Sequence, residues 1–336
     1  MKEAGRRPDI AAVAAAAGVS VTTVSHVLSG RRPVSARTRA KVEAVIEELG
    51  YRPNPSARSL RTDRSESIAL IVPDLTNPFY PLVAAGLQDV LMSSGYLLSV
   101  TDAALPSRAL PEVVRHVLAR RVDGIVLATY GATDQDIDKI AKSGTKLVRL
   151  GGRFRAEFGD IVRADDTSGV HDIVSHLIDR GYQRIAFLNG EPHAHPSQIR
   201  LEGYERALRE AGRPILPELI HSGTFTRAGG VEGAKVLLSR SPRPDALVCA
   251  NDLIAVGALD VTRQLGLSVP GDVAVTGYDD IEAASLITPA LTTVLNPARE
   301  IGRTCARLLL DRLAGEYDDT AREIVLAHRL IVRDSS

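Results

Sequence analysis

The sequence is poor in cysteine and contains no long apolar run. Only two cysteines, Cys249 and Cys305, occur among its 336 residues. They are too few for a disulfide framework, and this usage is typical of a reducing compartment. No stretch approaches the roughly 20 apolar residues of a membrane span. The Ala-rich run between Asp9 and Gly18 is too short and too closely flanked by polar sequence to be a signal peptide core. The secreted, membrane and collagen-like classes are therefore excluded.

The chain also lacks the excess charge and low hydrophobicity of disordered proteins. Charged residues make up 24% and hydrophobic residues 44% of the sequence, which suits two to three domains with buried cores. The net charge of zero conceals an asymmetry, because residues 1–64 contain 12 Lys and Arg against 6 Asp and Glu, whereas residues 65–336 contain 29 against 35. A basic segment joined to an acidic body indicates a polyanion-binding module followed by a module with another task.

The first fifty residues predict three short helices, over 10–17, 21–28 and 35–49. Each is preceded by or begins at a residue suited to capping its first turn. The capping residues are Asp9, Ser20 and Ser35. Gly18 supplies the tight turn between the first two helices. Two helices joined by a glycine turn and braced by a third form a helix-turn-helix unit.

The second helix has one apolar and one polar face. Its core face is predicted to contain Val24, Val27 and Leu28, which recur at helical spacing. The opposite face bears short, uncharged side chains that suit close approach to base edges, namely Val21, Thr22, Ser25 and His26. Basic residues flank this face and could contact phosphates; they are Arg31, Arg32, Arg37 and Arg39. The alternative is an ordinary three-helix mini-domain with a solvated polar face.

A short basic segment follows the third helix. Asn54 suits an N-cap and Pro55 the first position of a helix of about two turns. Such a helix is unstable alone in water, so we expect it to order only against a partner, for which its arginines favour DNA. Leu60 is its one large apolar side chain and suits a wedge between base steps of the minor groove. A plain linker with an incidental leucine is the alternative.

Beyond residue 66, short apolar runs alternate with helical stretches. The predicted strands are 68–72, 97–100, 124–127, 146–150, 184–188, 246–249 and 273–276. The predicted helices are 79–91, 111–120, 134–142, 168–180, 199–211, 230–239 and 253–265. This alternation predicts an α/β body with parallel sheets covered by helices on both faces. The number of elements favours two doubly wound lobes, with a ligand between them at the carboxyl ends of the strands.

Polar and aromatic side chains gather after these predicted strands. They are Asp74, Asn77, Phe79, Tyr80, Arg200, Asn251, Asp252 and Asp279. Such groups suit a polyhydroxylated ligand, because carboxylates and amides bond adjacent hydroxyls while aromatic rings cover the apolar sugar face. Taken one at a time, Asn251, Asp252 and Asp279 are better interpreted as helix caps.

Several motifs occur in a distinctive order and spacing. They are VSVTTVSHVLS (19–29), VSARTR (34–39), LGYRPN (49–54), ARSLR (57–61), GYDD (277–280) and TPALTT (288–293). As a set they resemble the LacI/GalR family of bacterial transcription regulators. The resemblance implies a helix-turn-helix headpiece over 1–53, a hinge helix and linker over 54–66, and an effector-binding domain over 67–336 that resembles periplasmic sugar-binding proteins. The implied lobes are about 67–164 with 291–320, and about 165–290 with 321–336.

By this resemblance the second helix is the recognition helix in the major groove. The residues implied to read bases are Val21, Thr22 and His26. The residues implied to hold the DNA backbone or make further operator contacts are Ser20, Thr23, Ser25, Ser29, Ser35, Thr38, Asn54 and Ala57. Leu60 becomes the minor-groove lever. The family usually has arginine at His26 and asparagine at Ser29, so the operator half-site is expected to differ from the common one.

For the body, the resemblance implies a small-molecule effector, a sugar or related metabolite, bound between the lobes. The residues implied to contact it are Asp74, Asn77, Phe79, Tyr80, Arg200, Phe225, Asn251 and Asp279. An acidic position of the family near the lobe hinge is Gly151 or Gly152 here, which removes one hydrogen-bonding group from the effector site.

The resemblance further implies a cytoplasmic homodimer on a pseudo-palindromic operator, associated with the nucleoid when bound. No membrane partner, cofactor, metal or catalytic residue is predicted, and no enzyme activity is expected. His193 and His195 lack further ligands at metal-binding spacing. A transporter's solute-binding protein and an orphan regulator without effector are the alternatives. In the favoured interpretation, effector binding moves the first lobes of the dimer and thereby controls folding of the hinge helices.

Overall fold

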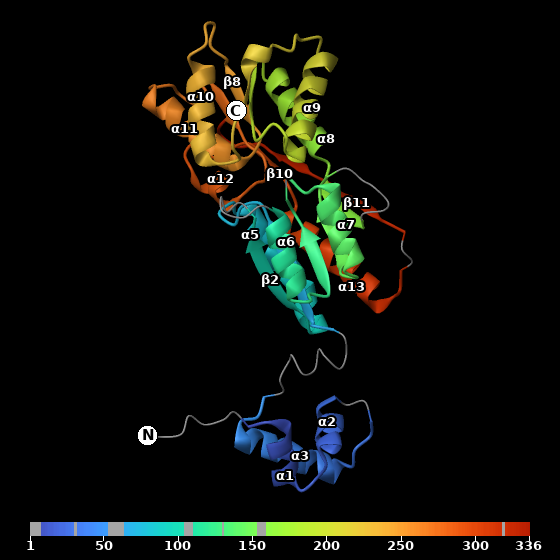
Figure 1. Cartoon of the computed structure of the whole chain (residues 1–336). Coiled ribbons are helices and arrows are strands. Elements are labelled where there is room, and N and C mark those ends of the chain that lie inside the picture. Colours follow the sequence, from blue (N-terminus) through green and yellow to red (C-terminus); the bar gives the residue numbers. More distant parts are fainter. Residues whose placement is uncertain are drawn as a thin grey trace. The chain divides into compact units, whose positions relative to one another are not determined.

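The computed structural model describes residues 8–29, 32–52, 64–103, 110–129, 131–152, 159–317 and 320–336, without the side chain of Ser29. The chain divides into two compact units, Met1–Ser65 and Glu66–Ser336 (Figure 1). The predicted operator contacts of the hinge helix lie outside the described ranges, as does one of the flanking arginines. These residues are Asn54, Ala57 and Leu60, and Arg31.

The smaller unit contains the three predicted helices, α1 (Ile10–Ala17), α2 (Val21–Ser29) and α3 (Ala36–Leu49). The predicted caps are confirmed. Backbone N–H groups donate to Asp9 Oδ1 at 2.9 Å, to Ser20 Oγ at 3.1 Å and to Ser35 Oγ at 3.2 Å. Gly18 ends α1 with a φ of 61°, a left-handed conformation that glycine adopts without the strain of a side chain.

A small apolar cluster holds these helices together. It consists of Val13, Ala14, Ala17, Val24, Val27 and Val42. The prediction that Leu28 belongs to this core is wrong, because its side chain is 38% exposed. Leu28 lies two turns from Val21, which is 45% exposed, so both residues occupy the same outer flank of α2, beside the strip that packs against α1 and α3.

No single helix in the described ranges is both long and apolar enough to cross a membrane. Among the described helices, only α1 and α2 taken together, over Ile10–Ala17 and Val21–Leu28, reach the length and apolar composition of a membrane span. Their axes are bent by 105° at the break between them, and the apolar side chains on their inner faces pack in the core of this unit.

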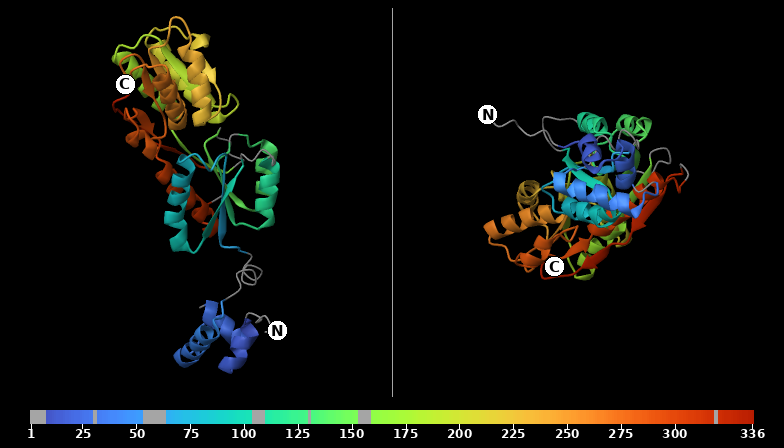
Figure 2. Two further views of the ribbon diagram at one scale, coloured as in Figure 1. Left: turned by 90° about the vertical axis from the view of Figure 1, so that its left-hand side faces the viewer. Right: turned by 90° about the horizontal axis from the view of Figure 1, so that it is seen from below.

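The larger unit begins with a lobe built on a six-stranded parallel sheet of order β11-β5-β4-β3-β1-β2. The strands are β1 (Ser67–Val72), β2 (Leu97–Asp102), β3 (Gly124–Leu127), β4 (Lys146–Leu150), β5 (Asp160–Ala164) and β11 (Glu323–Leu326). The covering helices are α5 (Phe79–Leu91), α6 (Leu110–Ala119), α7 (Asp134–Lys142) and α13 (Ala298–Ala314), with the short η1 (Met92–Ser94) after α5. Helices lie on both sides of this sheet (Figure 2, left).

The period of a strand explains why both faces are covered. In β1, Ile68, Leu70 and Val72 pack with α5 and α13, whereas Ala69 and Ile71 pack with α6 and α7. All five side chains are fully buried. A strand buried on both faces has a continuous apolar sequence rather than an alternating one, and this is how the sequence of β1 predicted its position inside the sheet.

The second lobe has a four-stranded parallel sheet of order β7-β6-β8-β9. Its strands are β6 (Ile185–Asn189), β7 (Ile220–Ser222), β8 (Ala246–Cys249) and β9 (Ala274–Thr276). Its helices are α8 (Asp166–Asp179), α9 (His195–Glu210), η3 (Pro217–Leu219), α10 (Arg227–Leu238), α11 (Asp252–Gln264) and α12 (Glu282–Leu286). The predicted fold class, two doubly wound parallel lobes, is confirmed, and every strand and helix predicted beyond residue 66 occurs within a few residues of its expected position.

The chain passes between the lobes after β5, after β9 and after β11. The last two passages contain β10 (Thr293–Leu295) and β12 (Arg329–Ile331), which pair antiparallel. The structure differs from the expected lobe boundary near residue 321, because β11 pairs with β5 and extends the first sheet instead of joining the second lobe. This strand covers the otherwise open edge of β5, which satisfies backbone groups that an edge strand leaves unpaired.

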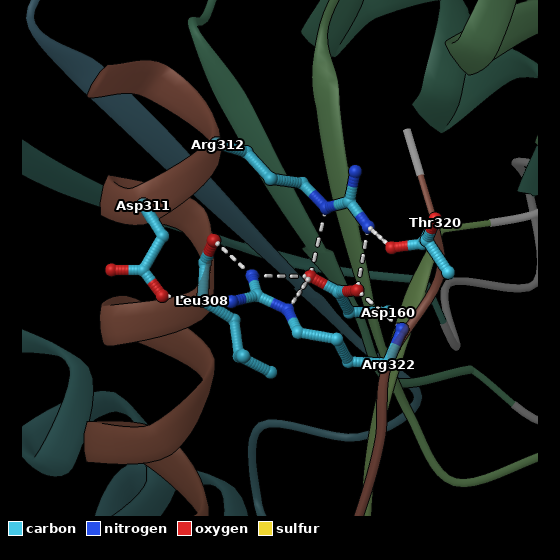
Figure 3. Close-up of polar contacts among 6 residues, drawn as sticks. All are labelled: Asp160, Leu308, Asp311, Arg312, Thr320 and Arg322. Atoms are coloured by element: carbon cyan, nitrogen blue, oxygen red, sulfur yellow. Dashed lines mark hydrogen bonds and ion pairs between the residues drawn. The ribbon is translucent and has the colours of Figure 1, made fainter. Parts of the chain in front are cut away.

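A buried ionic cluster fixes β11 and α13 to the first lobe (Figure 3). Asp160, fully buried at the start of β5, accepts two hydrogen bonds from Arg312 at 2.8 and 2.7 Å. It also accepts from the backbone and side chain of Arg322, each at 2.8 Å. Arg322 in turn donates to Asp311 at 2.8 Å and to the Leu308 carbonyl at 3.0 Å. Burial raises the pKa of Asp160, but the two guanidinium groups outweigh it and hold the pKa below its usual value.

Candidate functional site

A chamber with an empty volume of about 750 Å³ lies between the two lobes of the larger unit. Predicted effector residues from both lobes line it, as the parallel topology requires of segments that follow the carboxyl ends of strands. The predicted residues that line this inner chamber are Asn77, Phe79, Tyr80, Arg200, Phe225, Asn251 and Asp279. Asp74 does not; it lines a second chamber that adjoins the first.

Arg200, on α9, is the centre of a buried polar cluster. Its Nε donates to Asp166 Oδ1 at 2.8 Å and its Nη1 to the Ala250 carbonyl at 2.6 Å, and its Nη2 lies 3.7 Å from Asp279 Oδ1. The guanidinium carbon lies 4.0 Å from the centre of the Tyr278 ring. Burial acts to lower the pKa of Arg200, but the two carboxylates act in the opposite direction and more strongly, so the pKa is raised. The guanidinium therefore remains charged and is held in one orientation.

Asp279 is held in an unusual backbone conformation, with a φ of 109°. Its N–H donates to the Val294 carbonyl at 2.9 Å, and its Oδ1 accepts from Asn296 Nδ2 at 3.0 Å. Burial raises the pKa of Asp279 to about 6, although Arg200 opposes this shift. A non-glycine residue at such a φ costs about 1–3 kcal/mol and is concentrated at functional sites. The surrounding hydrogen bonds compensate for that strain.

The Asn296 side-chain oxygen is an acceptor that no described residue of the protein satisfies. The Asn296 side chain is 6% exposed and lines the inner chamber. Its Oδ1 is buried and has no hydrogen-bond partner among the described residues. Because buried polar atoms are nearly always hydrogen-bonded, this oxygen is suited to receive a hydroxyl of a bound molecule.

Only one of the three candidate helix caps proves to be one. Asn251 Oδ1 accepts from the Ile254 N–H at 2.8 Å and caps α11, while its Nδ2 donates to the Phe225 carbonyl at 3.0 Å. Asp252 lies outside the inner chamber and accepts from Thr293 Oγ1 at 2.6 Å. Asn251 therefore both begins a helix and positions the loop that carries Phe225.

Aromatic rings form opposite walls of the inner chamber. Phe79 and Tyr80 meet edge to face, with ring centres 5.3 Å apart and planes at 87°. On the second lobe, Phe225 packs against Gly190 so closely that a Cβ at that glycine would lie 2.3 Å from the ring. The absence of a side chain at Gly190 thus sets the depth of the chamber at Phe225.

Sequence reasoning missed several residues of this chamber. The missed side chains that line it are Thr129, Arg163, Asp166 and Asn296. Two successive aspartates, Asp165 and Asp166, stand at the start of α8. Asp165 does cap α8, accepting from the Ser168 N–H at 3.2 Å, but Asp166 turns to Arg200. The strand β5 directly before them would have indicated that Asp166 stands at the edge of a sheet. Its sequence contains Asp160 and Arg163, however, and so does not show the apolar pattern of a strand.

In the smaller unit, the predicted recognition helix presents a mostly exposed, uncharged face. Val21 and Thr22 are exposed, and Ser25 and His26 are partly exposed. The predicted backbone-holding hydroxyls lie in pairs at the amino ends of α2 and α3. Ser20 Oγ is 2.9 Å from Thr23 Oγ1, and Ser35 Oγ is 2.8 Å from Thr38 Oγ1. Helix amino ends favour anions, so both pairs are suited to phosphate groups.

Comparison with known proteins assigns the family. Residues 9–54 match the model of bacterial regulatory proteins of the lacI family, and residues 174–336 match the periplasmic binding protein-like domain. Catabolite control protein A of Priestia megaterium is 32% identical over 327 residues, which cover 96% of this chain and 98% of the relative.

Two solved structures resemble the chain over its length. The complex of the transcriptional regulator CelR with cellobiose has a TM-score of 0.75 at 34% identity, over 98% of this chain and 100% of that chain. The Lac repressor dimer bound to operator and the anti-inducer ONPF has a TM-score of 0.86 at 29% identity, over 98% of this chain and 99% of that chain. On the combined match of sequence and fold, the chain belongs to the lacI family of bacterial regulatory proteins.

Proposed function

We propose that this protein is a transcriptional repressor that binds operator DNA through its helix-turn-helix unit and a sugar effector through the chamber between its lobes. One observation carries the effector assignment. A charged Arg200–Asp166–Asp279 cluster and the open acceptor of Asn296 line a chamber walled by aromatic rings. No catalytic role is assigned to the chamber.

The chemistry of the chamber favours a sugar. Vicinal hydroxyls donate to carboxylate and amide oxygens and accept from guanidinium, which matches Asp279, Asn296 and Arg200. The rings of Phe79, Tyr80 and Phe225 offer apolar faces to the C–H face of a sugar ring. Cellobiose in the related CelR complex supports the same class of ligand.

The DNA assignment depends on α2. The proposed base-reading residues are Val21, Thr22 and His26, and the hydroxyl pairs at the amino ends of α2 and α3 are proposed to hold phosphates. Leu60 is the proposed minor-groove wedge of the hinge helix. The related Lac repressor, a dimer on its operator, supports a cytoplasmic homodimer of this chain on a pseudo-palindromic site.

Effector binding is proposed to change how the lobes are arranged. Asp166 begins α8 two residues after the end of β5, and Asn296 directly follows β10, so both lie where the chain passes between the lobes. A ligand that bonds these residues and the first-lobe residues Asn77 and Tyr80 has an affinity that depends on lobe arrangement. Such differential affinity is what shifts a conformational equilibrium.

The test uses the full-length protein. A random duplex library selected for binding yields the operator, and its affinity is then measured by electrophoretic mobility shift with and without a panel of sugars. We expect a two-fold symmetric site and at least one sugar that changes operator affinity about tenfold or more, a coupling in the usual range. An increase identifies a corepressor and a decrease an inducer. Absence of any selected sequence would contradict the DNA assignment, and insensitivity to every sugar would contradict the effector assignment.

A further inference from the structure

The inner chamber continues into an outer one. The outer chamber has an empty volume of about 1120 Å³. Asn77, Thr129 and Phe225 line both chambers, so the two spaces meet at the Phe225 ring. The outer chamber therefore adds room along which a ligand bound near Arg200 can extend.

The wall of the outer chamber combines acceptors with apolar surface. Glu191 Oε2 is buried without a hydrogen-bond partner in the described ranges. The Thr224 and Thr226 hydroxyls lie 2.8 Å apart. The apolar part of the wall is formed by Pro73, Ala103 and Leu110. A buried carboxylate oxygen without a partner is costly unless a ligand satisfies it.

The outer chamber is also acidic. Asp74, from the first lobe, and Glu191, from the second, both line it, and no lysine or arginine of the described residues does. Burial raises the pKa of Glu191, and the nearby Asp74 raises it further. An anionic group placed here meets two carboxyl groups, and His193 is the one basic side chain among the described residues that line the chamber, whereas a neutral hydroxyl finds acceptors.

From this geometry we infer that the effector contains at least two linked sugar rings and is uncharged at its outer end, a neutral disaccharide or a longer saccharide. One ring lies in the inner chamber against Arg200 and Asp279. The next passes the Phe225 ring and places its hydroxyls at Glu191. The inference rests on the proposed sugar-binding function and specifies the size and charge of the ligand.

Gly131 permits a direct steric test. It lines the outer chamber but not the inner one, and a Cβ added to it meets no atom within 4 Å. A Gly131→Phe side chain therefore starts from open space at its Cβ, on a residue that lines the outer chamber. Gly131→Ala is the matched control, because it makes the same backbone change and adds only a methyl group.

Binding to the full-length protein is measured by isothermal titration calorimetry with glucose, galactose, cellobiose, maltose, lactose, cellotriose and glucose 6-phosphate. We expect one saccharide of two or more rings to bind at least about tenfold more tightly than its own monosaccharide and than the phosphate. Gly131→Phe is expected to weaken binding of that saccharide about tenfold or more and to leave binding of the monosaccharide unchanged. Gly131→Ala is expected to change neither affinity. Glu191→Gln is expected to weaken the saccharide about tenfold, as loss of a charged hydrogen bond does.

The outcomes separate this inference from the function beneath it. A monosaccharide that binds as tightly as any longer saccharide, and is unaffected by Gly131→Phe, would overturn the two-ring ligand while leaving sugar control of the operator intact. Tightest binding by glucose 6-phosphate would overturn the assignment of a neutral outer end. If no saccharide of the panel binds, the sugar function and this inference both fail.

Discussion

Arg312, near the end of α13, donates two hydrogen bonds to Asp160 at the start of β5, from Nε to Oδ2 at 2.8 Å and from Nη2 to Oδ1 at 2.7 Å (Figure 3). The two residues lie far apart in the sequence, yet their contact and that of Arg322 hold α13 and β11 in the first lobe. Because Asp160 is fully buried, its removal leaves two guanidinium groups without their shared carboxylate.

We therefore expect Asp160→Ala to lower the free energy of unfolding by about 3–5 kcal/mol, measured by urea denaturation followed by circular dichroism at pH 7. Asp138→Ala is the matched control, because Asp138 pairs with Lys142 at 3.5 Å with both side chains at least half exposed. Its loss is expected to cost less than about 1 kcal/mol. Equal effects of the two substitutions would contradict a structural role for the buried cluster.

Arg200→Ala is expected to abolish the response of operator binding to effector and to leave operator affinity without effector unchanged. The guanidinium both contacts the chamber and neutralises Asp166 and Asp279. Mobility shift titrations with and without effector test this, with the melting temperature recorded as a check on folding. Arg209→Ala, on the exposed side of the same helix, is the control and should respond normally. A retained effector response in Arg200→Ala would show that the ligand binds elsewhere.

Leu60→Ala is expected to weaken operator binding about tenfold or more without changing effector affinity. A minor-groove wedge stabilises the kinked DNA that the headpieces bind, whereas it plays no part in the chamber. Mobility shift assays and calorimetry measure the two affinities separately. Unchanged operator affinity would mean that the segment around Leu60 is a plain linker.

His26→Arg is expected to change the preferred base pair at one position of each half-site, favouring guanine. Arginine bonds guanine O6 and N7 together, and histidine cannot form that bidentate contact. Selection from a random duplex library compares the two proteins. Identical selected sequences would remove His26 from the base-reading surface.

Asp279 predicts a pH dependence of stability. Its pKa is raised to about 6, so the folded protein binds this proton more tightly than the unfolded chain does. The stability that this carboxyl contributes is therefore full below about pH 4 and is lost as the pH rises to about 6. Asp279→Asn removes the titration. The quantity compared is the free energy of unfolding of Asp279→Asn minus that of the natural protein. We expect this difference to increase by on the order of 2 kcal/mol between pH 4 and 7. A difference that does not vary with pH would contradict the raised pKa.

The elements with long apolar runs were predictable, whereas short or polar ones were not. β1 and β3 are buried on both faces and have continuous apolar sequences. By contrast, β7 has three residues and β5 contains both Asp160 and Arg163, so neither shows a strand pattern. Their places in the sheets come from pairing with neighbours, which local sequence does not encode.

The candidate site shows the same division. Arg200 and Asp279 follow recognisable elements, so the sequence indicated them. Asp166 and Asn296 could be assigned to the site only from the folded structure, because the sequence did not predict the strands β5 and β10 that precede them. α13 was missed although Ile301, Cys305 and Leu308 give it an apolar stripe at helical spacing; only its place beside α5 required the folded structure.

The position of β11 also bears on how the protein is made. The first lobe takes its last helix and an edge strand of its sheet from residues beyond 297, whereas the second lobe forms its sheet from the continuous stretch between β6 and β9. During translation, the second lobe can therefore complete its sheet while β5 of the first lobe still lacks its partner strand β11. Residues up to Leu326 must therefore have left the ribosome before the lobe that was begun first can be completed.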